Sequence, residues 1–250
     1  MKFRISVILL IFAVILSFFL KADWWIYPIL ILIFGLLTFL GVVNMDFNWF
    51  LKNKISAPST SEKKIALTFD DGPTEITPKF LELLEKFDQK ATFFCIGKQI
   101  EKYPEILIKT YEKGHEIGNH SFSHSNKTGF LSTGEMISEI EKNDVVIERN
   151  LGFRPKIYRP PFGITNPNIA KAVRKTEKKS IGWNIRSFDT AISDEQKILK
   201  RIIPNIKPGS IILLHDTSKK TLHVLEQILL FLQRENYRSV TVSELLNLNK

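Results

Sequence analysis

Side chains that can bind metal ions or move protons gather in short segments of this chain. Asp70 and Asp71 stand together in the segment TFDDG, and His120 and His124 are four residues apart in the segment HSFSH. Two imidazoles and one carboxylate, with a coordination position left for water, are the usual ligands of a catalytic zinc ion. One helical turn would place His120 and His124 on the same side, about 5–6 Å apart. These residue types predict metal-assisted hydrolysis, although each segment alone is also typical of a surface turn.

The two aspartates are adjacent, and adjacent side chains of a strand face opposite sides of the sheet. That alternation stops where the strand ends. Asp70 and Asp71 directly follow the apolar run at residues 65–69, so both carboxylates can reach one site. We expect one of them to bind the metal and the other to stay free as a base.

Three further segments carry residues that suit catalysis. Arg159 opens the segment RPPFG, Asp189 ends the segment WNIRSFD, and His215 lies in the segment LLHD. Each segment follows a short apolar run of the kind found in buried strands. Because the C-terminal ends of parallel strands carry the active site of a barrel, we expect these residues to meet there. His115, at the start of a strand, and His223, on a helix, are expected to be solvated surface histidines outside the site.

From residue 64 onward, short apolar runs alternate with amphipathic segments, as in parallel strands joined by helices. Strands are expected at residues 65–69, 91–96, 116–118, 157–158, 179–183, 210–214 and 239–241. Helices are expected at residues 78–87, 104–113, 132–151, 168–176, 194–203 and 221–235. Ser132 and Glu135 form the capping-box pattern that opens the third of these helices. Seven strands with interleaved helices suit a barrel or an open doubly wound sheet.

Two long apolar runs precede this region. Residues 5–20 are apolar at fourteen of sixteen positions, and residues 26–43 contain no charged side chain. Each run approaches the roughly 20 residues that cross a hydrocarbon core of about 30 Å, where backbone groups must pair within a helix. Tryptophans lie near the ends of the runs, as expected at lipid headgroups, namely Trp24, Trp25 and Trp49. We expect a two-helix transmembrane hairpin; a signal peptide is the alternative, but no small-x-small cleavage pattern follows the first run.

The chain divides into a predicted membrane anchor at residues 1–57 and a predicted catalytic domain at residues 58–250. A short polar linker, expected at residues 55–62, spans the boundary between them. The net charge is +9, of which +3 lies in the anchor. Because the excess charge is spread along the chain, no nucleic-acid partner is expected. A mildly basic domain beside a bilayer is attracted to anionic headgroups or phosphate-bearing polymers. The lone Cys95 excludes an internal disulfide.

In this order, the segments TFDDG, HSFSH, RPPFG, WNIRSFD and LLHD resemble the motifs of the polysaccharide deacetylases of the NodB-homology family, carbohydrate esterase family four. The resemblance covers about residues 64–246. It implies an α/β fold, a distorted (β/α) barrel of seven or eight parallel strands. It also implies a metal-dependent enzyme that removes acetyl groups from N-acetylated sugars.

The resemblance assigns roles to individual residues. Asp71, His120 and His124 match the metal ligands of the family. Zinc is the expected ion, with cobalt or manganese as alternatives because all three accept histidine and carboxylate ligands. Asp70 matches the general base, and Arg159 matches the arginine that pairs with that base.

Five more positions match residues that act on the acetyl group or the leaving amine. His215 matches the general acid, and Asp189 matches the carboxylate that holds this histidine. The backbone N–H of Phe162 matches the oxyanion donor, and Leu213 matches a side chain of the pocket for the acetyl methyl group. Trp183 matches the fourth motif and is assigned to substrate binding.

The fourth motif departs from the family pattern at two positions. Arg186 stands where an acidic residue is usual, and Thr190 stands where a tryptophan is usual. We expect the missing ring to loosen the acetyl pocket or to change the tuning of His215. Substrate class and rate would then be affected, rather than the metal site.

The leading hypothesis is a membrane-anchored, metal-dependent hydrolase that removes N-acetyl groups from N-acetylglucosamine units of a cell-wall or surface polysaccharide, peptidoglycan or chitin-like. One alternative is a deacylase of a lipid-linked sugar at the membrane surface, and another is a non-catalytic saccharide-binding module with a decayed site. The expected partners are an N-acetylated glycan and the membrane, and no protein partner is inferred. The flanking charges place the catalytic domain in the cytoplasm by a margin of one charge. Because family substrates commonly lie outside, we favour an extracytoplasmic domain on a multi-pass anchor.

Overall fold

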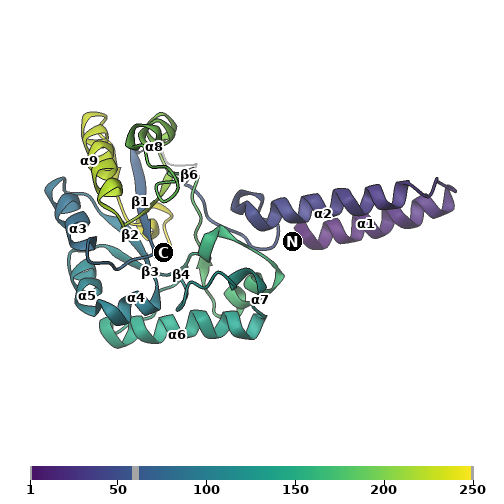
Figure 1. Cartoon of the computed structure of the whole chain (residues 1–250), viewed down its shortest axis with the longest axis horizontal. Helices are drawn as coiled ribbons and strands as arrows, with labels where there is room; N and C mark the ends of the chain where they lie inside the picture. Colours follow the sequence, from purple (N-terminus) through teal and green to yellow (C-terminus); the bar gives the residue numbers. More distant parts are fainter. Residues whose placement is uncertain (1, 58–61, 249–250) are drawn as a thin grey trace.

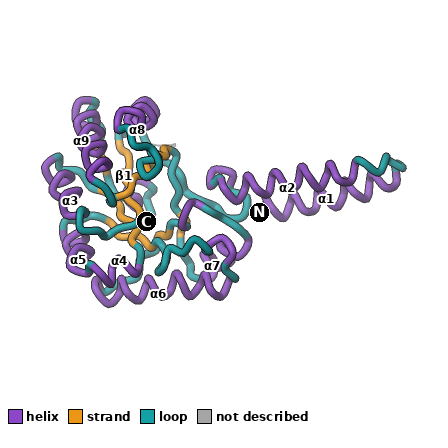
Figure 2. The backbone as a smooth tube through the Cα atoms, viewed as in Figure 1, coloured by secondary structure: helices purple, strands orange, loops and turns teal. Residues whose placement is uncertain are grey.

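One parallel sheet forms the centre of this computed structural model, which describes residues 2–57 and 62–248 (Figures 1 and 2). The order β5-β4-β3-β2-β1-β7-β6 places β1 in the middle, and β8 pairs with β1 outside this order. All of these pairings are parallel. The strands are β1 (Lys64–Asp70), β2 (Ala91–Cys95), β3 (Glu116–Asn119), β4 (Ile157–Tyr158), β5 (Lys179–Ser180), β6 (Ile185–Arg186), β7 (Ile211–His215) and β8 (Arg238–Ser239).

The seven strands of this order form a distorted barrel that stays open between β5 and β6, since no pairing joins these two strands within the described ranges. The last residues of the predicted membrane anchor cross the opening instead. Lys54 pairs with Ile181, directly after β5, and Ser56 pairs with Ser210, directly before β7. The predicted distorted barrel of parallel strands is confirmed. Only β6 had not been expected, because Ile185 is followed by the charged Arg186 and the pair forms no apolar run.

Helices cover the outside of the sheet (Figure 1). They are α3 (Thr77–Lys86), α4 (Gly97–Lys102), α5 (Pro104–Glu112), α6 (Thr133–Leu151), α7 (Pro167–Lys175), α8 (Glu195–Ile202), α9 (Lys219–Arg234) and α10 (Val242–Leu245). The six predicted helices are present, and the capping box of Ser132 and Glu135 opens α6 as expected. The short helices α4 and α10 were missed because neither is long enough to show an amphipathic pattern.

Alternate strand residues pack into two different layers. On β1, Leu67 and Phe69 belong to an outer hydrophobic cluster packed against the helices, whereas Ala66 belongs to an inner cluster. On β7, Ile211 belongs to the inner cluster. Side chains of a strand alternate with a period of two. His215, four residues after Ile211, therefore lies on the inner side of the barrel.

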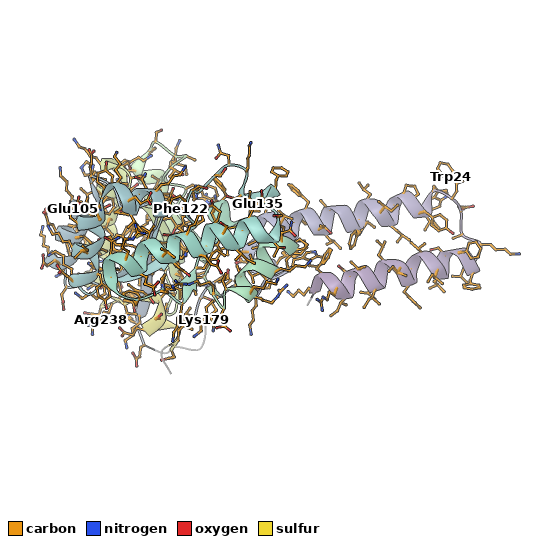
Figure 3. The ribbon with its side chains drawn as sticks, turned by 90° about the horizontal axis from the view of Figure 1, so that it is seen from below. Trp24, Glu105, Phe122, Glu135, Lys179 and Arg238 are labelled. Atoms are coloured by element: carbon orange, nitrogen blue, oxygen red, sulfur yellow. The ribbon has the colours of Figure 1, made fainter. Side chains whose placement is uncertain are left out.

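Two apolar helices, α1 (Lys2–Phe19) and α2 (Ile26–Val43), form a hairpin that projects from the barrel (Figure 1). Trp24 lies at the tip, far from the barrel (Figure 3). The surface of the hairpin is apolar, since Phe18 and Leu32 are each 71% exposed. By length and composition, both helices are able to cross a membrane.

The base of the hairpin packs against the globular fold. Trp49 and Phe50 are buried in a cluster that includes residues of α6 and α7. The Thr165 N–H donates to the carbonyl of Val42 at 3.0 Å, and the Thr165 hydroxyl donates to the carbonyl of Gly41 at 3.1 Å. These bonds satisfy carbonyl groups at the end of α2 that have no partner within the helix. They also fix the hairpin to the loop that follows β4.

Part of the predicted polar linker at residues 55–62 is packed rather than free. Ser56 forms a bridge with Ser210, and the Ala57 N–H donates to the carbonyl of Gly209 at 2.8 Å. Residues 58–61 of the predicted linker lie outside the described residues. The division into an anchor at 1–57 and a catalytic domain at 58–250 stays a prediction, and residues 45–57 pack against the barrel.

Candidate active site

The segments with candidate catalytic residues meet at the C-terminal ends of the strands. Asp70 ends β1 and His215 ends β7, and the two residues are paired in register. His120 directly follows β3, and Arg159 directly follows β4. The parallel sheet therefore brings together segments that are far apart in the sequence.

Asp70 and Asp71 reach the same site because the backbone turns sharply between them. Asp71 has a φ of 75°, in the left-handed region, directly after extended β1. Aspartate visits this region more readily than most residues because its short side chain can hydrogen-bond locally. The turn ends the alternation of the strand, as predicted, so both carboxylates face the imidazole of His120.

His120 and His124 are close together, but not for the expected reason. No helix is present at residues 120–124, and Ser121 and His124 have positive φ angles of 65° and 48°. The two imidazole centroids are 4.8 Å apart. Asn119 Oδ1 accepts from the Ser121 N–H, and Asn143 Nδ2 donates to the Ser121 carbonyl. The predicted proximity is right, whereas the helical turn that was expected to cause it is wrong.

Asp71, His120 and His124 fit a divalent cation. Each offers one ligand atom, and these atoms lie within 4.8 Å of one another. Oδ1 of Asp71 is 3.5 Å from Nε2 of His120 and 3.4 Å from Nε2 of His124. This oxygen is buried and has no hydrogen-bond partner among the described residues. A buried, unpartnered carboxylate oxygen beside two imidazole nitrogens has the chemistry of a zinc-type site.

The protonation of Asp71 and the orientation of His120 also suit a cation. Burial raises the pKa of Asp71, but the nearby imidazoles of His120, His124 and His215 outweigh burial and lower the pKa to about 2. Nδ1 of His120 lies 2.8 Å from the carbonyl oxygen of Arg159. A hydrogen bond at Nδ1 fixes the proton there and leaves Nε2 to bind a metal. The three residues can thus offer one anionic oxygen and two nitrogens.

Asp70 lies beside these ligands but is held by a different partner. Nη1 of the fully buried Arg159 donates to Oδ1 of Asp70 at 2.7 Å and to the Thr68 hydroxyl at 2.8 Å. The other guanidinium nitrogens donate to the carbonyls of Ile181 and Gly182. Charge-assisted bonds to a rigid guanidinium orient a carboxylate well. Oδ2 of Asp70 is 3.7 Å from His120, so a second carboxylate faces the metal site.

His215 and Asp189 form a second pair on the other side of the site. Nδ1 of His215 is 2.8 Å from Oδ1 of Asp189, and the His215 backbone N–H donates to Oδ2 at 2.9 Å. Burial lowers the pKa of His215, but the hydrogen bond and charge of Asp189 outweigh it and raise the pKa to about 9. Nε2 of His215 is 3.9 Å from Oδ2 of Asp71. A protonated nitrogen therefore faces the metal ligands at neutral pH.

The loop after β4 brings a backbone donor and an aromatic side chain to the site. Phe162 has a φ of 59°, and its ring centroid lies 4.5 Å from that of His124. No acceptor among the described residues takes the Phe162 N–H. Gly163 packs against Trp183 so closely that a Cβ atom on Gly163 would lie 2.6 Å from the Trp183 ring. Leu213, on the same face of β7 as His215, is 3% exposed.

The two departures in the fourth motif have different consequences. Arg186 pairs in register with Leu213, and its guanidinium lies 5.6 Å from the Trp183 ring and 4.5 Å from the Phe188 ring. The side chain of Arg186 thus places a cation beside the predicted acetyl pocket. Thr190 is exposed. The hydrogen bonds between Asp189 and His215 form without a ring at position 190.

Several polar residues that support the site were missed in the sequence. Ser187 and Thr221 donate hydroxyl hydrogen bonds to Asp189, and Thr68 donates to the carbonyl of Ile212 while accepting from Arg159. The sequence could have pointed to Thr68, which is a polar residue inside an apolar strand, and to Ser187, which stands two residues before Asp189. Thr221 is a helix residue without a local signal.

Asp216 is another missed residue, although it belongs to the segment LLHD. It is fully buried and accepts a hydrogen bond from the Thr77 hydroxyl. Its carboxylate packs against Gly72, where a Cβ atom would lie 2.4 Å from Asp216. Burial raises the pKa of Asp216 to about 7. The contacts join the loop after β1 to the end of β7, so Asp216 supports the loop that carries Asp71.

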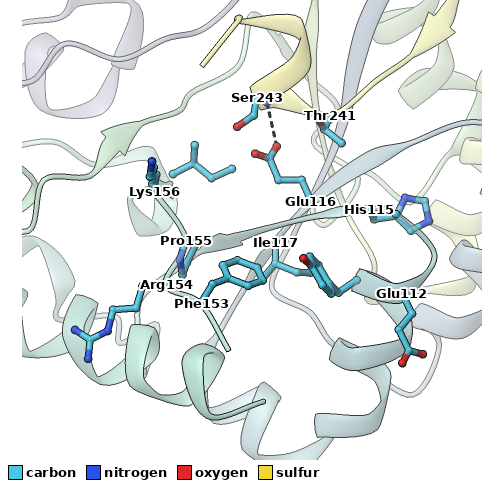
Figure 4. Close-up of a pocket in the computed structure, with 13 residues that line it drawn as sticks. Glu112, His115, Glu116, Ile117, Phe153, Arg154, Pro155, Lys156, Thr241 and Ser243 are labelled. Carbon is cyan, nitrogen blue, oxygen red and sulfur yellow. Dashed lines mark hydrogen bonds between the residues drawn. The ribbon is translucent and has the colours of Figure 1, made fainter. Parts of the chain in front are cut away.

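A separate hollow of about 780 Å³ lies at the opposite ends of the strands (Figure 4). It is lined by residues that include His115 and Glu116, the latter at the start of β3. Burial lowers the pKa of His115 to about 4. The Ser243 N–H donates to Glu116 in this hollow. His115 therefore lies outside the catalytic site, as predicted, and the hollow is not part of that site. The expectation that His115 is solvated is wrong, because the residue is 3% exposed and its Nδ1 accepts from the Ala91 N–H.

Comparison with known proteins identifies relatives for most of the chain. Residues 57–181 match the polysaccharide deacetylase family. The peptidoglycan-N-acetylmuramic acid deacetylase PdaC of Bacillus subtilis is 35% identical over 192 residues, which are 76% of this chain and 40% of PdaC. A peptidoglycan-N-acetylglucosamine deacetylase of Bacillus cereus is 32% identical over 210 residues, 82% of this chain and 76% of that protein. The chain thus spans less than half of PdaC.

Solved structures agree with this result. The structure of PdaC from Bacillus subtilis aligns with a TM-score of 0.69 at 34% identity, over 76% of this chain and 92% of that one. BA3943 from Bacillus anthracis, described as a pseudoenzyme of family CE4, aligns with the same TM-score of 0.69 at 27% identity, over 74% and 66% of the two chains. Catalytic and non-catalytic relatives therefore share this fold, and the side chains at the site must decide between them.

Proposed function

Because this chain belongs to the polysaccharide deacetylase family, we propose that it is a membrane-anchored enzyme that removes N-acetyl groups from N-acetylglucosamine units of peptidoglycan. One observation carries the proposal. Two hydrogen-bonded pairs, Asp70 with Arg159 and His215 with Asp189, flank the cluster of Asp71, His120 and His124 from two sides. Hydrolysis of an amide needs a base for water and an acid for the amine, and these pairs supply both.

A divalent cation held by Asp71, His120 and His124, zinc or alternatively cobalt or manganese, would polarise the acetyl carbonyl and lower the pKa of a bound water. Asp70 takes a proton from the attacking water while Arg159 holds its other oxygen. The Phe162 N–H donates to the developing oxyanion, and a donor of this kind typically contributes about 2.7–4 kcal/mol.

His215 completes the reaction by giving its Nε2 proton to the departing nitrogen. The C–N bond breaks, the amine stays on the sugar, and acetate leaves with the oxygen of the water. Asp189 raises the pKa of His215, so the proton is present at neutral pH. Leu213 and Trp183 form the surroundings of the acetyl group, in which Arg186 adds a cation that family members usually lack.

The hairpin of α1 and α2 is proposed as the anchor. Each helix has 18 residues, about 27 Å at 1.5 Å per residue, close to the thickness of a hydrocarbon core. A cleaved signal peptide is disfavoured because the end of α2 is hydrogen-bonded to Thr165 and the segment after it is buried. Since both helix ends at the base contact the barrel, the N-terminus and the catalytic domain lie on one side of the membrane. We place that side outside the cytoplasm, where peptidoglycan is.

The alternative of a lipid-linked sugar substrate is favoured by one observation. Phe162 stands three residues before Thr165, which is bonded to the end of α2, so the site lies close to the base of the hairpin. The non-catalytic alternative is disfavoured because Asp70, the base candidate, and His215, the acid candidate, are both present and hydrogen-bonded to their expected partners.

Acetate release tests the proposal. The full chain in detergent should release acetate from peptidoglycan and from N-acetylglucosamine oligomers, and Asp70→Asn should lose at least about a hundredfold in rate. Asp88→Asn, an exposed aspartate, is the matched control and should keep full activity. Full activity in Asp70→Asn would overturn the assignment. Preference for a prenyl-phosphate sugar over glycan would favour the lipid-linked substrate.

A further inference from the structure

The base of the hairpin carries a cluster of cationic side chains that the catalytic site does not use. Arg4, in the first turn of α1, and Lys171 and Arg174, on α7, line one hollow of about 540 Å³. No residue that lines the hollow is acidic. Within residues 2–57 and 62–248, no ion pair joins these three side chains to a carboxylate. We call Arg4, Lys171, Arg174 and the hollow between them the basic cradle.

The inner wall of the basic cradle is aromatic. It is formed by Phe3, Trp49 and Phe50, and the ring centroids of Phe3 and Phe50 are 4.8 Å apart. Trp49 is 8% exposed, and its five-membered ring packs against Gly41 of α2. The three rings thus give the basic cradle an apolar wall beside its cations.

The position of the basic cradle relative to the membrane follows from the orientation of the hairpin. Trp24 marks the tip of the hairpin (Figure 3), and Arg4 lies in the opposite end turn of α1. If α1 and α2 cross the bilayer, Arg4 and α7 lie at the headgroups on the barrel side (Figure 1). Ile5 and Ile8 of α1 are 49% and 65% exposed, so an apolar surface leads from the basic cradle into the hydrocarbon layer.

From these observations we propose that the basic cradle binds the phosphate headgroup of an anionic phospholipid, whose acyl chains lie along α1. This proposal rests on the membrane anchor of the proposed function. Three cations attract the negative phosphate, and the aromatic wall and the exposed isoleucines fit the acyl chains. Free phosphate would satisfy only the first of these features. The bound lipid would hold the barrel at a fixed height and orientation over the membrane.

Lipid retention tests the proposal without any reference to catalysis. The full chain is purified in detergent with equal amounts of phosphatidylglycerol and phosphatidylcholine, and retained lipid is measured by native mass spectrometry. One cation near an anionic surface changes binding roughly fivefold. We expect the wild-type chain to retain phosphatidylglycerol about tenfold or more over phosphatidylcholine.

Variants assign the preference to the basic cradle. Arg4→Gln, Lys171→Gln and Arg174→Gln together should reduce the preference below about twofold, and Arg174→Gln alone should reduce it in part. The matched control replaces two arginines and one lysine that are exposed elsewhere, by Arg149→Gln, Arg238→Gln and Lys142→Gln, and should keep the preference.

Three results would overturn the proposal. They are equal retention of the two lipids by the wild-type chain, an equal loss of preference in the matched control, and a site that binds inorganic phosphate but shows no lipid preference. Carbonate extraction and acetate release separate this failure from that of the proposed function. A chain that stays in the membrane and releases acetate but shows no lipid preference refutes the basic cradle alone. A chain that carbonate removes from the membrane refutes the anchor, and with it the basic cradle.

Discussion

The charge of Asp189 should set the alkaline limit of activity. Asp189 holds His215 through a contact of 2.8 Å at Nδ1 and a backbone bond of 2.9 Å, and the pKa of His215 is raised from 6.5 to about 9. At 1.36 kcal/mol per pH unit, this corresponds to about 3 kcal/mol in favour of the imidazolium. Asp189→Asn keeps the size of the side chain and removes its charge. The variant therefore isolates the electrostatic part of the pair.

The sign of the expected shift is clear. A raised pKa keeps His215 protonated to higher pH, so the general acid is lost only as the pH rises through that raised value. Without the carboxylate charge, the alkaline limb of kcat should move to lower pH by about 1–3 units. At pH 7.5 the rate should fall about tenfold or more, and part of it should return near pH 6. A bound cation lowers the pKa of His215 in both proteins, so the difference between the two profiles is the quantity to compare.

The assay is acetate release from an N-acetylglucosamine oligomer between pH 5 and 10, for the wild-type chain, Asp189→Asn and Thr221→Val. Thr221→Val removes one hydroxyl bond to Asp189 but no charge, so it should shift the profile less than Asp189→Asn. If Asp189→Asn lowers the rate equally at every pH, the carboxylate only positions His215, and the electrostatic reasoning is refuted.

Two further predictions concern stability and the hairpin. Arg159→Gln leaves the carboxylate of Asp70 buried without its cation and should lower the free energy of unfolding by about 3–5 kcal/mol in urea titrations, whereas exposed Arg149→Gln should change it by less than about 0.5 kcal/mol. An unchanged midpoint would contradict a buried ion pair. Thr165→Val removes a hydroxyl bond to the end of α2 and should cost about 1–3 kcal/mol. It should also lower kcat more than it changes KM, because the same loop carries Phe162. A Thr165→Val enzyme with wild-type kcat would show that the contact between the hairpin and this loop does not affect the active site.

The sequence carried enough information for the fold, because its strands are apolar runs bounded by chemistry-bearing residues. Short apolar runs located the strands that end at Asp70 and His215, and amphipathic patterns located the helices between strands. The short β6 was missed because Ile185 is followed by the charged Arg186 and the pair forms no apolar run. The bridges of Lys54 and Ser56 to the barrel escaped as well, because a polar segment next to an apolar helix looks like a linker. Such contacts depend on which strands the segment meets in space.

The residues of the site were predicted better than the backbone turns and contacts that bring them together. His120 and His124 are close because a turn with two positive φ angles brings them together, and side-chain spacing alone suggested a helix. The support of Asp189 by Thr221 joins residues of separate elements, which no local pattern encodes. The role of Asp216 was hidden for the same reason, since its partner Thr77 lies 139 positions earlier. Residues that touch the substrate are thus easier to find than those that position them.

Metal content is the most direct test of the account, because the whole mechanism depends on one cation at Asp71, His120 and His124. The full chain, stripped with chelator and dialysed against zinc, cobalt or manganese, is measured by inductively coupled plasma mass spectrometry. We predict close to one ion per chain in the wild-type protein and in His223→Ala, whose histidine is exposed on α9, and almost none in His124→Ala. One ion per chain in His124→Ala, or none in the wild-type protein, would contradict the central claim.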